Sequence, residues 1–169
     1  MEPYEIVPLA AIGPFRLGLP RAHAQQLLSA LPDFASAPDG VGYGRGRDRR
    51  GCVELTYDAD VDTVVGVEVF WGGSVEPTIG GRPVFSRGVE VVVAELAGRS
   101  RFVPDDYQTG CVCLFPEWEL RFWRPAPADS AEDFDRRHYW SVAIGVKGFF
   151  TAGHAQTLAV ADPPETAGR

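Results

Sequence analysis

Residues 12–28 read Ile-Gly-Pro-Phe-Arg-Leu-Gly-Leu-Pro-Arg-Ala-His-Ala-Gln-Gln-Leu-Leu, a turn that leads into a helix. Pro20 suits the first helical turn, where the N–H that proline lacks would have no partner. Four apolar side chains then share one helical face: Ala24, Leu27, Leu28 and Leu31. Pro32 follows directly and ends the helical pattern. This spacing predicts a helix from about Pro20 to Leu31 with one buried face.

Beyond this helix the hydrophobic period changes to two, which indicates half-buried strands. Strands are expected over residues 53–57, 65–71, 111–115, 118–123 and 139–146. The apolar faces carry Val53, Leu55, Tyr57, Val65, Val67, Val69, Trp71, Trp118, Leu120, Phe122, Trp140, Val142 and Ile144. A second helix is expected at about 86–97, closed by Gly98. The Gly-Arg-rich segment 40–51 indicates a mobile basic loop or an irregular edge strand.

A short motif occurs twice, which suggests an internal repeat. Phe15-x-x-Gly18 precedes the first helix, and Phe85-x-x-Gly88 lies at the start of the second, 70 residues later. The alternative is chance alignment. The repeat predicts an α+β fold of two tandem α-then-antiparallel-β halves, about 1–80 and 81–161. One continuous sheet with both helices on one side would form a single domain, 1–161, followed by a frayed tail, 162–169.

The opening Phe15-Arg-Leu-Gly-Leu-Pro-Arg-Ala-His-Ala-Gln-Gln-Leu-Leu resembles the repeat of the β-lactamase-inhibitor proteins and the bacterial BamE-like modules. This resemblance implies a sheet face suited to gripping another protein. The chain departs from that pattern because it lacks a secretion signal and a pairable cysteine set. It is also similar to small uncharacterised bacterial proteins with an aromatic-rich strand like Arg121-Phe-Trp-Arg and a final stretch like Gly148-Phe-Phe.

The composition indicates the class of protein and its cellular compartment. The 169 residues are 45% hydrophobic and 23% charged, which is typical of one globular domain. No apolar run is long enough for a membrane helix, and no signal peptide is visible, so a cytoplasmic location without membrane association is expected. Fifteen Arg against a single Lys, with no Asn, indicate a high-G+C bacterial genome.

The formal charge of −7 constrains the partner. Residues 52–124 alone hold twelve acids against six bases. This field repels phosphate backbones, so nucleic acid is not expected as a partner. It would steer a basic protein toward the chain. The alternative is that the charge serves solubility alone.

The sequence contains no recognisable catalytic or metal-binding motif. Cys52, Cys111 and Cys113 lack the paired spacing of a zinc site and are expected to be reduced thiols. The histidines 23, 138 and 154 show no metal-ligand spacing, and the acidic run 129–135 lacks a calcium-loop pattern. No cofactor or metal is therefore predicted. A dispersed catalytic site assembled by the fold stays open as an alternative.

The outward faces of the expected strands carry the candidate binding residues. Aromatic side chains and an arginine lie there among carboxylates, which is typical of a protein-binding surface. These residues are Glu54, Glu68, Phe70, Glu119, Arg121, Trp123, Tyr139 and Ser141. The alternative is that loops or the tail cover Phe70 and Trp123.

These observations favour a cytosolic, non-catalytic protein-binding module. An immunity-type inhibitor of a toxin, with a basic nuclease or deaminase as target, fits the acidic charge. The rival hypothesis is a small enzyme or small-ligand-binding protein with a pocket between sheet and helices. A cluster of histidine and carboxylate in a deep pocket would favour this rival, and an open aromatic sheet face would favour the binding module.

Overall fold

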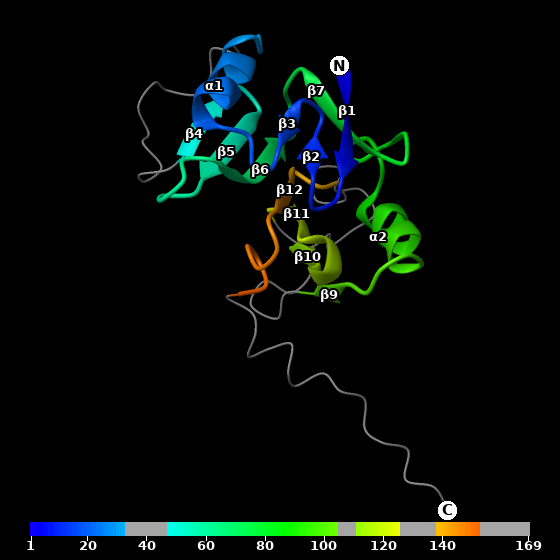
Figure 1. Ribbon diagram of the computed structural model, residues 1–169. Helices are drawn as coiled ribbons and strands as arrows, with labels where there is room; N and C mark the ends of the chain where they lie inside the picture. The colour runs from blue at the N-terminus through cyan, green and yellow to red at the C-terminus, as the bar shows by residue number, and fades with distance from the viewer. Residues whose placement is uncertain (33–46, 105–110, 126–137, 153–169) are drawn as a thin grey trace, which may run out of the picture.

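The computed structural model describes residues 1–32, 47–104, 111–125 and 138–152 (Figure 1). Two helices are described, α1 (Arg21–Ser29) and α2 (Val89–Ala97), together with a 3-10 turn at Pro116–Trp118. The acidic run 129–135, most of the Gly-Arg-rich segment, His154 and the tail 162–169 lie outside the described residues. Among the described residues, no helix has the length and apolar character needed to cross a membrane.

The strands form two sheets, and the class is α+β. The smaller sheet has the order β3-β2-β1-β7-β8: Phe15–Arg16, Ala11–Ile12, Glu2–Val7, Val75–Ile79 and Arg82–Pro83. The larger sheet has the order β4-β5-β6-β12-β11-β10-β9: Arg47–Arg50, Val53–Tyr57, Val64–Phe70, Ser141–Gly145, Leu120–Trp123, Val112–Phe115 and Val103–Pro104. The predicted strands 53–57, 65–71, 111–115, 118–123 and 139–146 all correspond to strands of the larger sheet. The Gly-Arg-rich segment ends in its edge strand β4.

The larger sheet is antiparallel throughout its described pairs, and its register explains its inner face. One row of facing residues runs Val53, Val69, Val142 and Phe122 across four neighbouring strands. A second row runs Leu55, Val67, Ile144 and Leu120. All eight are almost fully buried, as the period-two pattern predicts.

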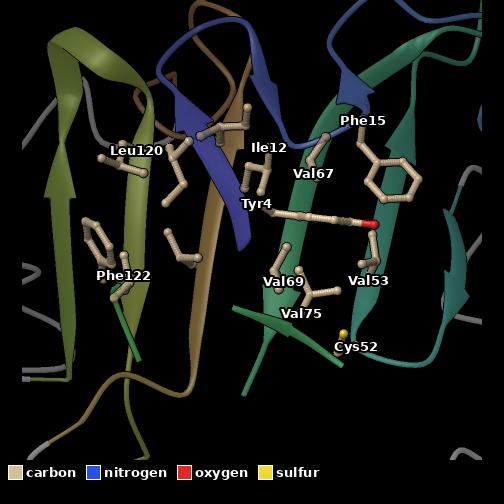
Figure 2. Close-up of a cluster of buried hydrophobic side chains, with 14 of the residues drawn as sticks. Tyr4, Ile12, Phe15, Cys52, Val53, Val67, Val69, Val75, Leu120 and Phe122 are labelled. Carbon is tan, nitrogen blue, oxygen red and sulfur yellow. The ribbon is translucent and has the colours of Figure 1, made fainter. Parts of the chain in front are cut away.

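The smaller sheet supplies much of the cover over this inner face. In Figure 2, Tyr4 of β1 lies against Val67 and Val69 of β6, with Ile12 and Phe15 close by. These residues belong to one continuous hydrophobic core. Strand β1 pairs with β7 in parallel, which brings the N-terminal strand beside a segment about 70 residues away in the chain.

The predicted arrangement of one continuous sheet with both helices on one side is not confirmed. Hydrogen bonding separates two sheets, and the helices lie at opposite ends of the molecule (Figure 1). Strands β1 and β7 contain Pro3 and Pro77, and a proline within a run of residues counts against a strand. The period-two pattern therefore does not predict the smaller sheet.

The two repeated glycines also differ. Gly18 adopts a left-handed backbone (φ +81°) two residues before Pro20, the residue that caps α1. Gly88 is itself the cap of α2, with an extended backbone (φ −60°, ψ 144°). Phe15 and Phe85 are both buried. The two phenylalanines of the motif are therefore alike in burial, whereas the two glycines differ in backbone conformation and in their distance from the helix start.

Candidate functional site

The outer face of the larger sheet brings six of the eight predicted residues into two neighbouring rows. Glu54 faces Glu68 in one row, which continues through Ala143 to Arg121. The next row runs from Phe70 through Ser141 to Trp123. The alternation that buries Val69 and Phe122 places these side chains on the opposite side of the sheet.

The charges in these rows are largely satisfied within the chain. Arg47 contacts the buried Glu54 carboxylate at 3.1 Å, and Arg121 contacts Glu68 at 3.2 Å. The buried Ser141 hydroxyl donates to Glu68 at 2.6 Å. These carboxylates therefore contribute little free negative charge for a partner.

Glu119 is covered by the turn after β12 and is not an exposed residue of this face, contrary to the prediction. The 3-10 turn ends just before Glu119, which adopts a left-handed backbone (φ 43°). Its carboxylate is 2% exposed and accepts hydrogen bonds from the backbone N–H groups of Gly148, Phe150 and Thr151, and from the Thr151 hydroxyl. Glu119 therefore fixes the turn that follows β12.

Tyr139 belongs to the core, so the prediction that it lies on the outward face of the sheet is wrong. Strand β12 begins only at Ser141, so the alternation does not extend back to residue 139. The Tyr139 ring lies 4.8 Å from the Phe122 ring, and the residue is 1% exposed. Burial raises the pKa of this phenol, and the nearby Cys113 thiol acts in the same direction.

Beyond the ends of the strands the alternation no longer applies, and there three tryptophans form a cluster that the sequence pattern does not predict. The period-two pattern assigns Trp71 and Trp140 to the inner face, but each lies just beyond the end of its strand. Their ring centroids are 5.9 Å apart, and the Trp123 ring meets Trp140 edge-on at 6.5 Å. Trp71, Trp123 and Trp140 are called the tryptophan cluster below. The Gly72-Gly73 pair directly after Trp71 is the sequence signal that the strand ends there.

The tryptophan cluster is held by backbone pairing and is partly open to solvent. The Trp71 N–H donates to the Trp140 carbonyl at 2.8 Å, and the Trp140 N–H donates to the Trp123 carbonyl at 2.7 Å. Trp71 is 48% exposed, while the other two are half-buried. The cluster therefore presents aromatic surface from a fixed backbone.

Arg49 extends this aromatic surface toward the edge strand. Its guanidinium lies 4.3 Å from the centre of the Phe70 ring, a cation–π contact. The Nε–H group of Arg49 donates to the Gly51 carbonyl at 3.5 Å. Arg49 is exposed, and no carboxylate among the described residues forms an ion pair with it.

The turn after β12 covers the other end of the outer face. A side chain at Gly66 would meet the end of the Phe149 ring at 2.7 Å, so that ring lies directly over β6. The Phe150 ring lies 4.9 Å from the Arg121 guanidinium. The turn therefore does not cover the opposite end of the predicted face, where Phe70 and Trp123 lie in register through Ser141.

The described histidines and cysteines do not form a metal cluster. His23 is exposed on α1 and His138 is half-buried, while Cys52, Cys111 and Cys113 are free thiols. No group of three or more His, Cys, Asp or Glu is arranged to hold a metal within the described ranges. Burial raises the pKa of the Cys113 thiol, which disfavours the reactive thiolate.

Comparisons with known protein families, curated proteins and solved structures find no significant match for this chain.

Proposed function

We propose that the chain is a non-catalytic protein-binding module whose contact surface consists of Arg49, Phe70, Trp71, Trp123 and Trp140. The observation that carries this proposal is the 48% exposure of Trp71 beside two further tryptophans. Tryptophan and arginine are the side chains most enriched among residues that dominate binding energy at protein interfaces.

The rigidity of the contact surface supports the same function. Its tryptophans are linked through backbone hydrogen bonds, and Phe70 ends a seven-residue strand inside the larger sheet. Little conformational entropy would be lost when a partner covers these rings, because the backbone is already ordered.

The overall charge supports a more specific proposal, an immunity-type inhibitor that acts in the cytosol. A formal charge of −7 would accelerate the encounter with a basic partner such as a nuclease or deaminase toxin. This charge acts at long range, whereas the aromatic contact surface supplies short-range affinity. The proposal thus gives a role both to the acidic net charge and to the aromatic contact surface.

A paired affinity purification tests the contact surface. The full chain, its Trp71→Ala/Trp123→Ala variant and a Val91→Ala control are immobilised and exposed to lysate of the native cells. Val91 is 55% exposed on α2, so the control also removes exposed apolar surface. We expect the full chain and the Val91→Ala control to retain one protein. Titration of that protein should show at least about 30-fold weaker binding to the tryptophan variant. Equal retention by all three folded proteins would overturn the proposal.

A further inference from the structure

Arg49 differs from its neighbouring arginines in having no acidic partner among the described residues. Arg47 pairs with Glu54 and Arg121 pairs with Glu68 on the same face of the sheet. The guanidinium of Arg49 is instead stacked on Phe70 and exposed. Its Nε–H group donates to the Gly51 carbonyl, which leaves the two terminal NH₂ groups at the exposed edge. Stacking orients the planar guanidinium while these groups stay available.

The surroundings of Arg49 define what a partner must offer. The two nearby carboxylates are already engaged, so among the described residues the uncompensated charge of the contact surface is positive, although the whole chain is acidic. Phe70 is in register with the half-buried Trp123 through Ser141, and the exposed Trp71 follows Phe70 directly in the chain. A cationic group therefore lies next to apolar aromatic surface.

We propose that the contact surface receives a protein segment that places a carboxylate on Arg49 and an apolar or aromatic side chain on the tryptophan cluster. This inference rests on the proposed function and specifies its partner. A carboxylate accepts two parallel hydrogen bonds from a guanidinium, and such charge-assisted bonds are stronger than neutral ones. The partner is then basic as a whole, with an acidic side chain at its point of contact.

Because the chain is acidic overall, binding of an acidic segment at Arg49 can be distinguished from non-specific electrostatic attraction. A chain of charge −7 repels acidic peptides unless a local cation captures them. Enrichment of acidic peptides would therefore require a specific site, whereas enrichment of basic peptides would need none.

Peptide display tests the proposal directly. A library of random twelve-residue peptides is selected on the full immobilised chain, and enriched peptides are synthesised and titrated. The same peptides are titrated against Arg49→Ala, Arg49→Lys, Trp71→Ala and Arg16→Ala. Arg16 is exposed on β3 of the smaller sheet, so its variant removes an equal charge elsewhere. Circular dichroism and thermal melts establish that each variant is folded.

We expect the enriched peptides to combine Asp or Glu with an aromatic or large apolar residue. Their binding should weaken by about tenfold or more in Arg49→Ala and Trp71→Ala, and stay unchanged in Arg16→Ala. Arg49→Lys should recover only part of the loss, since an ammonium lacks the planar geometry. Peptides that need Trp71 but neither carry an acid nor respond to Arg49→Ala would overturn this inference and leave the proposed function standing. Failure to enrich any peptide that depends on Trp71 would count against both.

Discussion

Phe122 and Trp123 are neighbours in sequence whose side chains lie on opposite faces of the larger sheet. Phe122 is fully buried and contacts Tyr139, whereas Trp123 is half-buried on the outer side. We expect Phe122→Ala to lower the free energy of unfolding by about 3–5 kcal/mol because it leaves a cavity in the core. Trp123→Ala should lower it much less. Chemical denaturation of both variants measures the difference, and equal losses would place Trp123 in the core.

The three cysteines offer a second test at the level of single residues. Cys52 is buried, Cys111 and Cys113 are half-buried, and burial raises the pKa of the Cys113 thiol. We therefore expect Cys113 in the native protein to react with iodoacetamide at pH 8.5 more slowly than a free thiol. After denaturation without reductant, all three should be alkylated. Mass spectrometry checks both results, and a disulfide in the native protein would contradict them.

At the level of elements, the turn after β12 depends on a glycine in β6. A methyl group at Gly66 would lie 2.7 Å from the tip of the Phe149 ring, closer than packed carbon atoms approach. We expect Gly66→Ala to destabilise the protein by about 1–3 kcal/mol through overpacking. In the Phe149→Ala background the same substitution should cost clearly less, because the clashing ring is absent. Additive losses in this double-mutant cycle would show that Phe149 does not lie over β6.

Helix α1 is attached to edge strand β4 through Asp48, which receives hydrogen bonds from Arg21 and Gln25. Burial alone would raise the pKa of Asp48, but these hydrogen bonds outweigh it and lower the pKa. A lowered pKa in the folded state gives stability that is present above the unfolded value, about 3.9, and lost as pH falls through the folded value. The stability lost in Asp48→Asn should therefore be largest near neutral pH and shrink in acid. Denaturation curves at several pH values check this, and a constant difference from pH 7 to pH 2 would contradict it.

The sequence pattern is sufficient where apolar and other residues alternate regularly along a strand. It predicts Val53, Val69 and Phe122 on the inner face, because each lies within such a strand. It assigns Tyr139 and Trp140 to the wrong faces, because alternation holds only between the first and last paired residue of a strand.

Two further differences arise from interactions between distant segments. The smaller sheet depends on the parallel pairing of β1 with β7, which no local pattern encodes. The burial of Glu119 depends on hydrogen bonds to a turn about 30 residues later. Both are tertiary effects that override local propensity.

Considered as a whole, the molecule combines an acidic overall charge with a contact surface whose free charge is positive. The net charge of −7 arises mainly in residues 52–124, whereas the carboxylates nearest the contact surface are paired with Arg47 and Arg121. Raising the salt concentration should therefore slow association with a basic partner and leave the dissociation rate nearly unchanged. Stopped-flow or surface-binding kinetics measure the two rates separately. A salt effect confined to dissociation would show that the overall charge does not steer the encounter.

Site-specific photocrosslinking in the native cells tests the central claim, that this chain binds a protein through its tryptophan cluster. A photoreactive benzoylphenylalanine is placed in the full chain at position 71, where it retains an aromatic ring, and in a second sample at position 91 on α2. The proposed contact surface predicts a covalent adduct with one protein from position 71 and none from position 91. No protein adduct from position 71, or the same adduct from both positions, would contradict it.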